Sequence, residues 1–291
     1  MSTVECVVAG KNRLGETPIW SVEEQALYWV DAREPAVYRL DPSSGQVTSV
    51  KLPVVVGCIG FRKSGGLIAG LQNGFHTLDF ATGALSLIFD PEADQPENRI
   101  NDGRADRRGR FWAGTMNDVR RDPTGSLYRL DADHRCTKLR DDVIVPNALA
   151  WSPDDKTMYF ADTYRFHILQ YDFSADDGVI SNERLFADCT ASKPGRPDGA
   201  TIDADGCLWN AEYGGGRIVR YTPAGKIDRV IPMPVSQTSS CAFGGPKLDT
   251  LYVTSASQRL TPEQLAAEPL AGNLFAIHVG VSGLPEPAYA G

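Results

Sequence analysis

A strand pattern that recurs six times along the 291 residues is the strongest constraint on the fold of this chain. Each copy is a five-residue apolar run, most of them with an aromatic side chain, and a second run of strand character follows it. The apolar runs occupy residues 27–31, 67–71, 111–115, 158–162, 208–212 and 251–255, and the second runs occupy residues 36–41, 74–79, 126–131, 167–172, 217–222 and 273–278. Repeats at intervals of roughly 40 to 50 residues are typical of β-propeller blades.

The turns between the runs indicate how the strands pair. Short segments rich in Gly, Asp, Ser and Pro separate them, as at residues 41–45, 63–66 and 203–206, and strands joined by such turns pair antiparallel. The polarity alternates with a period of two residues, and 28 Gly with 19 Pro would interrupt long helices. We therefore predict an all-β, six-bladed β-propeller that forms a single domain over residues 1–291.

The first strand of the chain has no blade of its own. Residues 4–9 have strand character, whereas the sixth blade, at 240–243, 251–255 and 273–279, has only the short segment 285–289 left for a fourth strand. We expect the N-terminal strand to pair with the last blade and close the ring, which leaves no long sheet edge exposed. The insert at 261–268 begins with Thr and Pro and predicts a short surface helix.

Polar residues lead the innermost strands. When these strands are aligned on one position, which is a large apolar residue in five of the six, the residue four places earlier carries a side-chain oxygen in five of six blades. The six aligned residues are Glu16, Gly57, Asn101, Asn147, Asp198 and Ser239. Inner strands line the channel of a propeller, so we expect these residues to form one ring at its mouth. Asp or Asn alone is a common turn residue, but turns do not require polarity at one register in five repeats.

This ring predicts a site for one divalent metal ion. Two carboxylates and one or more amides are oxygen ligands that suit calcium, magnesium or manganese, and zinc also accepts carboxylate oxygens. No Cys or His occupies a ring position, and the four histidines fall at 76, 134, 167 and 278, away from the ring. Because the chain also has no Gly-x-Ser-x-Gly motif, Ser-His-Asp catalysis has little support.

Charge and composition limit the partners. The formal net charge of −8 argues against nucleic acid or an anionic membrane as the main partner. The N-terminal residues lack the features of a secretory signal, no apolar run approaches about 20 residues, and the six cysteines are scattered. We expect a cytoplasmic protein, monomeric or a small homo-oligomer, that acts on a small molecule.

Six motifs together resemble one known family. They lie at residues 15–20, 98–103, 109–116, 146–152, 197–199 and 241–245, in the same order as in the senescence-marker-protein/gluconolactonase family, which includes regucalcin and bacterial sugar lactonases. The resemblance implies that Glu16, Asn147 and Asp198 bind the metal, that Arg99 and Asn101 hold the sugar hydroxyls, and that Asp198 is also the base that handles the attacking water.

One departure from the family pattern concerns the substrate. Some members carry a substrate-contacting Glu just after the motif at 109–116, whereas this chain has Asn117 and Asp118 there. Either Asp118 replaces that Glu in binding substrate, or the sugar is held differently. The loop 117–125 is longer than its counterparts, and we expect it on the same face as the ring, as a specificity lid or as a solvated charged loop.

The sequence therefore predicts metal-dependent hydrolysis of a sugar (aldono-) lactone to its aldonic acid. A lactone is an activated ester, so a metal that polarises the carbonyl and a carboxylate that takes a proton from water suffice without a covalent nucleophile. Two alternatives remain open: hydrolysis of another ester, such as an organophosphate or an aromatic lactone, at the same site, and a non-catalytic propeller that binds calcium.

Overall fold

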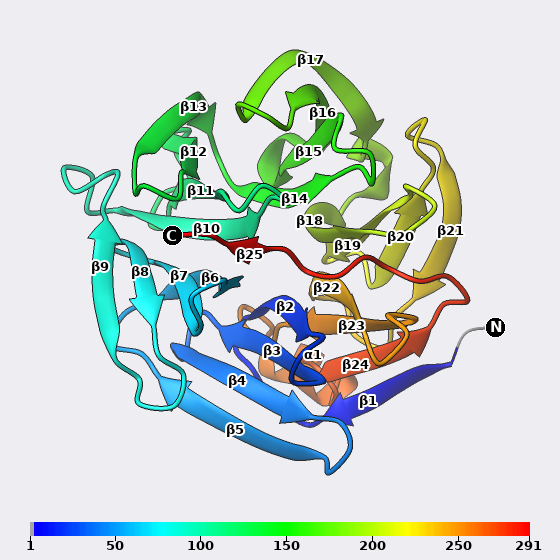
Figure 1. Ribbon diagram of the computed structural model, residues 1–291. Coiled ribbons are helices and arrows are strands. Elements are labelled where there is room, and N and C mark those ends of the chain that lie inside the picture. The colour runs from blue at the N-terminus through cyan, green and yellow to red at the C-terminus, as the bar shows by residue number, and fades with distance from the viewer. Residues whose placement is uncertain (1–2) are drawn as a thin grey trace.

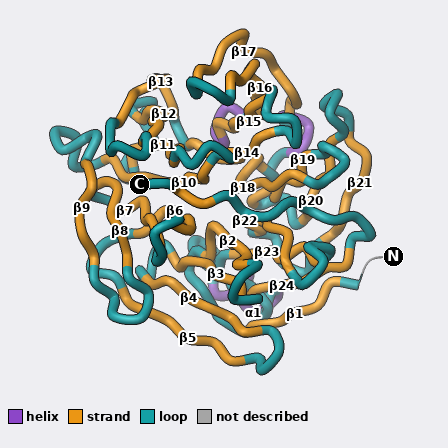
Figure 2. Tube along the Cα trace, in the orientation of Figure 1, coloured by secondary structure: helices purple, strands orange, loops and turns teal. Residues whose placement is uncertain are grey.

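Six antiparallel sheets surround a central channel in the computed structural model, which describes residues 3–291 (Figure 1). Strands dominate the trace and helices are few and short (Figure 2). The first three blades are β2 (Gly15–Ser21), β3 (Ala26–Asp31), β4 (Ala36–Asp41) and β5 (Gln46–Lys51); β6 (Val56–Arg62), β7 (Leu67–Leu71), β8 (Gly74–Leu78) and β9 (Leu85–Phe89); and β10 (Asn98–Ala105), β11 (Phe111–Asn117), β12 (Gly125–Leu130) and β13 (Cys136–Val143).

The remaining blades follow the same order from the channel outwards. They are β14 (Pro146–Trp151), β15 (Thr157–Asp162), β16 (His167–Ser174) and β17 (Val179–Asp188); β18 (Arg196–Ile202), β19 (Leu208–Tyr213), β20 (Arg217–Tyr221) and β21 (Ile227–Pro232); and β22 (Thr238–Gly244), β23 (Thr250–Ser255) and β24 (Leu274–His278), completed by β1 (Val4–Val8). The predicted six-bladed propeller is confirmed. Residues 1 and 2 of the predicted domain lie outside the described range.

The N-terminal strand closes the ring. β1 pairs antiparallel with β24, with Val4 opposite Ile277 and Cys6 opposite Phe275, and Figure 1 shows it as the outermost strand of the sixth blade. This confirms the predicted crossover. Because the first and last parts of the chain share one sheet, the ring is held together by backbone hydrogen bonds.

The predicted helix is also present. α1 (Pro262–Ala267) begins after Thr261, whose hydroxyl accepts from the backbone N–H of Gln264, and the Gln264 side chain accepts from the Thr261 N–H in return. This reciprocal capping box satisfies backbone donors that a helix start leaves free. Two 3₁₀ turns, η1 (Thr163–Arg165) and η2 (Thr190–Ser192), are the other helical elements found in residues 3–291. Within that range, no helix has the length and apolar character needed to cross a membrane.

All six inner strands contain a β-bulge close to the ring position. At each register shift the inner strand has one residue more than its partner. The shifts lie between Glu16 and Ile19, Val56 and Cys58, Ile100 and Gly103, Asn147 and Ala150, Pro197 and Ala200, and Thr238 and Ser240. A bulge bends the strand and redirects a side chain. The repeated bulge therefore changes the direction of side chains near the ring positions, so they do not follow the ordinary alternation between the two faces of a strand.

The C-terminal segment covers the end of the channel where the inner strands finish, opposite the end that carries the ring residues. β25 (Ala288–Tyr289) adds to blade two by pairing parallel with Phe61 and Arg62 at the end of β6, and Figure 1 shows this segment crossing the ring. Partly buried Glu286 pairs with Arg104 of β10, with 3.0 Å between Oε1 and Nε. The ring residues lie near the starts of the inner strands, so the chain closes one end of the channel and leaves the other for a site.

Two of the five tryptophans have a clear structural role. Trp112 and Trp209 are fully buried between blades. Their indole N–H groups donate to Asp106 and Asp203, six residues earlier, over 2.9 Å and 2.8 Å. Each Asp lies in the turn between the first two strands of its blade. These tryptophans therefore fix turns on the closed side of the propeller.

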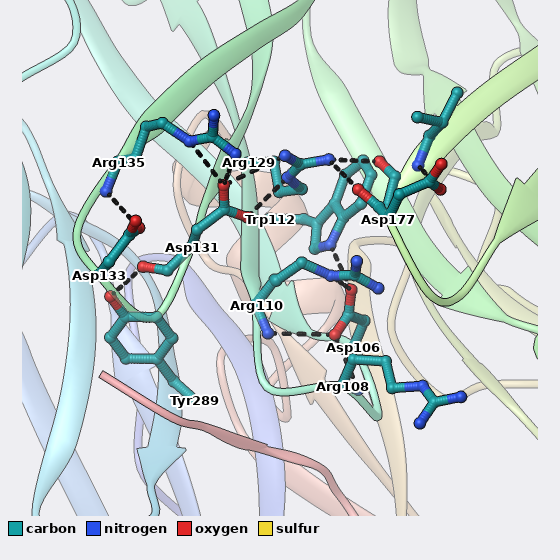
Figure 3. A network of polar contacts seen from close by, with 12 residues as sticks. Asp106, Arg108, Arg110, Trp112, Arg129, Asp131, Asp133, Arg135, Asp177 and Tyr289 are labelled. Carbon is teal, nitrogen blue, oxygen red and sulfur yellow. Dashed lines mark hydrogen bonds and ion pairs between the residues drawn. The ribbon is translucent and has the colours of Figure 1, made fainter.

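An extended set of ion pairs surrounds Trp112 (Figure 3). We call it the blade-three cluster, and it consists of Asp106, Arg110, Trp112, Arg129 and Asp131. Arg110 Nε lies 2.6 Å from Asp106 Oδ2, and Arg129 Nε lies 2.8 Å from Asp131 Oδ1. Arg129 also donates to the carbonyls of residues 177 and 178 in blade four. The cluster joins two blades, and every carboxylate in it has a cationic partner.

Candidate active site

A cavity opens where the inner strands begin. Four of the six ring residues line it: Glu16, Asn101, Asn147 and Asp198. Arg99 lines it too. Of the remaining ring residues, Gly57 has no side chain and Ser239 is fully buried, with its hydroxyl donating to the carbonyl of Gly15. The predicted ring is thus a cluster on four blades, and Ser239 serves the backbone between blades six and one.

The walls of this cavity include residues that the sequence does not single out. The other lining residues are Leu14, Arg33, Met116, Arg121, Val145, Thr163, Tyr164, Arg196, Tyr213, Gln258 and Arg259. Arg121 comes from the loop 117–125, so that loop lies on the predicted face and contributes to the wall. No histidine lines the cavity within the part of the chain that the structure describes.

Glu16 and Asp198 are carboxylates without a cationic partner. Asp198 is 6% exposed, and among residues 3–291 neither side chain forms an ion pair. Burial raises the pKa of both groups well above their ordinary values. The negative charge of Asp102 raises both further, and at Glu16 the charge of Asp198 adds to the shift while that of Arg99 opposes it. Two neighbouring acids, one partly buried and one buried, are unfavourable when both are ionised, unless a cation joins them.

A chain of hydrogen bonds fixes the orientation of Asn147. Its Nδ2 donates to Thr163 Oγ1 over 2.7 Å, and the Thr163 hydroxyl donates to the carbonyl of Pro197 over 2.8 Å. Because the hydroxyl proton is used on Pro197, Thr163 can only accept from the Asn147 amide. The Asn147 Oδ1 is therefore the amide atom available to the cavity, and it suits a cation.

Asn101 and Arg99 extend this chain into blade three. Asn101 Nδ2 donates to the carbonyl of Pro146 over 2.9 Å and to Asn147 Oδ1 over 3.3 Å. Its Oδ1 accepts from Arg99 Nη1 over 2.9 Å. Arg99 is buried, with 3% exposed. The bulges thus bring side chains from blades three and four into one ordered network, with Asp198 on the adjacent blade.

The donor set fits a hard divalent cation. It offers two carboxylates without a cation and an amide oxygen whose direction is fixed, and the two negative charges balance a divalent ion. In the described part of the chain, no group of three or more His, Cys, Asp or Glu side chains is arranged for a metal. A cation at this site therefore depends on the amide of Asn147 as well as on Glu16 and Asp198.

Asp118 lies against three arginines rather than on the cavity wall. Its two oxygens each accept from Arg33 over 2.6 Å, and they form ion pairs with Arg99 Nε at 3.1 Å and Arg121 Nη1 at 3.2 Å. Burial alone would raise the pKa of Asp118, but the arginines lower it below its usual value. Asp118 therefore holds three of the arginines that line the cavity, and its direct contact with substrate stays a prediction.

The sequence could have indicated one of the additional cavity residues. Arg196 precedes the motif at 197–199 and is two residues from Asp198 of the ring, so the repeat also places it at the cavity. Other cavity residues lie in segments outside the repeat. Tyr164 belongs to η1, and Gln258 and Arg259 belong to the loop after β23. Blade alignment gives no register for such loops, and only the folded structure brings them to the cavity.

The chain resembles known proteins over most of its length. A family model described as SMP-30/gluconolactonase/LRE-like region matches residues 14–257. The chain is 42% identical to a 6-deoxy-6-sulfogluconolactonase of Pseudomonas putida over 99% of both chains, and 37% identical to regucalcin of Xenopus laevis over 99% of this chain and 98% of that protein.

The fold has a close solved counterpart. The crystal structure of a calcium-binding protein, regucalcin from Agrobacterium tumefaciens, superposes with a TM-score of 0.95 at 32% identity, over 99% of this chain and 97% of that one. The family model covers most of the chain, and the similarity to these relatives extends over nearly its whole length. The protein belongs to the SMP-30/gluconolactonase/LRE-like family, as its motifs predict.

Proposed function

We infer that the protein is a hydrolase that opens a sugar lactone to the corresponding aldonic acid. One relative is named as a 6-deoxy-6-sulfogluconolactonase, and the family, SMP-30/gluconolactonase/LRE-like, includes gluconolactonases. The observation that carries the proposal is the pair of carboxylates formed by partly buried Glu16 and buried Asp198, which share a cavity with an oriented amide and form no ion pair in the described structure.

One divalent ion is proposed as the cofactor. Glu16, Asn147 and Asp198 would hold it, and calcium, magnesium, manganese and zinc all accept such ligands. When bound, the ion would supply a Lewis acid that polarises the lactone carbonyl. The relative from A. tumefaciens is described as calcium-binding, which supports a divalent ion here without choosing among the four.

Asp198 is proposed as the general base. It takes a proton from water while the water oxygen attacks the carbonyl carbon, and the bond from that carbon to the ring oxygen then breaks. The proton passes to the departing ring oxygen, which becomes a hydroxyl, and the new carboxylic acid ionises near neutral pH. Without an ion, burial and the charge of Asp102 raise the pKa of Asp198. With an ion bound, the carboxylate would stay deprotonated, as a general base must be before it accepts a proton.

Arg99 and Asn101 are proposed to position the sugar. Both line the cavity, and their mutual hydrogen bond fixes both side chains before substrate arrives, which lowers the entropic cost of orientation. Asp118 contributes through Arg99 and the two neighbouring arginines that it binds. This arrangement favours the second of the two predicted alternatives, in which the sugar is held by groups other than an acid at position 118.

Proton release tests the proposed function. Chelator-treated protein should release no acid from a panel of pentono- and hexonolactones beyond spontaneous hydrolysis, and restoring calcium, magnesium, manganese or zinc should restore release. Glu16→Gln should need more metal and be partly rescued by excess metal. Glu24→Gln, which changes an exposed carboxylate of the turn after β2, is the matched control and should behave as wild type.

Two results would count against the proposal. Turnover unaffected by chelator or metal would remove the metal from the reaction and make Glu16 structural. Metal binding by the folded protein with no lactone consumed would favour the non-catalytic calcium-binding alternative, and esters such as organophosphates would then be the next substrates to test. The cytoplasmic location and the small oligomeric state stay predictions.

A further inference from the structure

The cavity has an excess of positive charge that a neutral sugar does not require. Five arginines line it, in a protein whose net charge is −8. They are Arg33, Arg99, Arg121, Arg196 and Arg259. The carboxylates that line the cavity or form ion pairs with its arginines are Glu16, Asp198 and Asp118. The first two are the proposed ligands of a divalent ion, which leaves Asp118 alone against five guanidinium groups.

The five arginines divide into two groups. Arg33, Arg99 and Arg121 all contact Asp118. Arg196 and Arg259 form no ion pair within residues 3–291. Like charges brought together repel one another. An arginine cannot relieve this repulsion by losing a proton, because the guanidinium group stays charged in proteins. The uncompensated part of the cavity is thus the part around Arg196 and Arg259.

Arg196 is held in place by aromatic rings. Its guanidinium carbon lies 4.6 Å from the centroid of the Tyr164 ring and 5.6 Å from that of the Phe166 ring. Its Nε is buried and has no hydrogen-bond acceptor. Stacking restrains the guanidinium without using the N–H donors in its plane. A buried charged donor with no acceptor is costly, so this arrangement favours a ligand that supplies the acceptor.

Two further arginines approach the same tyrosine. Burial alone would raise the pKa of the Tyr164 hydroxyl, but the guanidinium groups of Arg121, Arg196 and Arg259 lower it below its usual value. The three come from different blades: Arg121 from the loop after β11, Arg196 from the start of β18, and Arg259 from the loop after β23. They therefore converge on one wall of the cavity, next to Tyr164.

We propose that Arg196, Arg259 and Arg121 form an anion subsite for a negatively charged group carried by the sugar lactone at the end remote from its carbonyl. This rests on the proposed lactonase function, which places the carbonyl at Asp198. Arg196 precedes Asp198 by two residues, roughly 7 Å of extended strand, a span suited to a six-carbon lactone substituted at its last carbon. The group is a sulfonate, a phosphate or a carboxylate, since planar guanidinium groups pair with the oxygens of each.

Substrate preference tests the subsite. We would compare kcat/KM for unsubstituted gluconolactone with the 6-phospho and 6-deoxy-6-sulfo lactones and with a lactone of glucaric acid, which carries a carboxylate at that end. At least one anionic lactone should exceed the unsubstituted one, and the best of them identifies the group. Arg196→Gln should lower kcat/KM for that lactone on the order of 10- to 100-fold, as expected for a charge-assisted hydrogen bond, and lower it by a clearly smaller factor for gluconolactone.

Two variants control this test. Arg196→Lys keeps the charge but loses the planar fork, so its kcat/KM for the anionic lactone should fall between wild type and Arg196→Gln. Arg184→Gln removes an exposed arginine of the outer strand β17 that is paired with Asp172. It should leave kcat/KM unchanged for both lactones. The subsite proposal would be wrong if Arg196→Gln lowered kcat/KM equally for both lactones, or if the wild-type enzyme preferred the unsubstituted lactone. Either result would still be compatible with the proposed lactonase activity.

Binding separates failure of the subsite from failure of the reaction. Calorimetry of wild type and Arg196→Gln with gluconate, 6-phosphogluconate, 6-deoxy-6-sulfogluconate and glucarate requires no turnover. Tighter binding of an anionic aldonate than of gluconate, lost in Arg196→Gln, supports the subsite even if no lactone is hydrolysed. Equal affinity for gluconate and all three others would overturn it, whatever the enzyme does to lactones.

Discussion

The blade-three cluster and the cavity use the same residue types in opposite ways. In the cluster, Asp106 accepts from Arg110, from Trp112 and from two backbone N–H groups, and Asp131 pairs with Arg129 and Arg135 (Figure 3). In the cavity, at the other end of the inner strands, Glu16 and Asp198 have no cationic partner among the described residues. The carboxylates of the cluster all have cationic partners. Within residues 3–291, the cavity acids Glu16 and Asp198 lack a cation, and Arg196 and Arg259 lack an anion.

This difference separates charges that stabilise the fold from charges kept for a ligand. Removing one partner of a buried pair leaves an uncompensated charge and costs about 3–5 kcal/mol, so the blade-three cluster resists change. The cavity already carries such uncompensated groups, which the native fold tolerates because the rest of the propeller holds them in place. Each can therefore be changed with a larger effect on ligands than on stability.

The largest effect is expected for Asp198→Asn. Loss of the proposed base should lower kcat at least about 1000-fold, within the range of general-base catalysis, because an amide cannot accept the proton of water. The melting temperature of the metal-free variant should equal or exceed that of metal-free wild type, since a buried carboxylate without a partner is gone. Initial rates on gluconolactone and thermal unfolding measure the two effects. Near-normal turnover would remove Asp198 from the base role.

The converse variant is Asp106→Asn in the blade-three cluster. The amide would place N–H donors against Arg110 or Trp112, so we expect a loss of about 3–5 kcal/mol in the free energy of unfolding, measured with urea. The kcat of the folded fraction should stay near that of wild type because Asp106 lies on the closed side of the propeller. Unchanged stability, or a loss of kcat in folded protein, would break the contrast between the two regions.

The sequence predicts the fold and the ring because both depend on the repeat. Alternating strands and short turns define the blades, and one register then brings Glu16, Asn101, Asn147 and Asp198 to one cavity. The crossover of the N-terminal strand follows from a missing fourth strand in the sixth blade. These predictions use only local periodicity and the need of each sheet for a partner.

The parts that the sequence does not predict depend on contacts between blades. Ser239 occupies the ring register but turns to the carbonyl of Gly15, because a polar residue at a bulge can serve the backbone equally well. The arginines around Asp118 and the position of Tyr164 depend on loops that the repeat does not align. A charge pattern shows that arginines are present, and only the folded chain shows which of them have no acid.

The smallest effect concerns pH, and it distinguishes two aspartates beside the same cavity. The pKa of Asp118 is lowered in the folded protein, so its contribution to stability is present above its ordinary pKa and is lost as the pH falls through the lowered value. The pKa values of Glu16 and Asp198 are raised above their ordinary values of 4.5 and 3.8. Their contribution is fully present below those values and is lost as the pH rises through the raised ones.

Metal-free wild type should therefore lose melting temperature as the pH rises from about 5 to 8, and Asp198→Asn should show a shallower decline. A bound metal requires deprotonated ligands, so the gain in melting temperature on adding metal should grow over the same range in wild type and be smaller in the variant. If the melting temperature of the two metal-free proteins had the same dependence on pH, the charges of Glu16 and Asp198 would already be compensated. The cavity would then resemble the blade-three cluster, and its unpaired charges would no longer indicate a ligand.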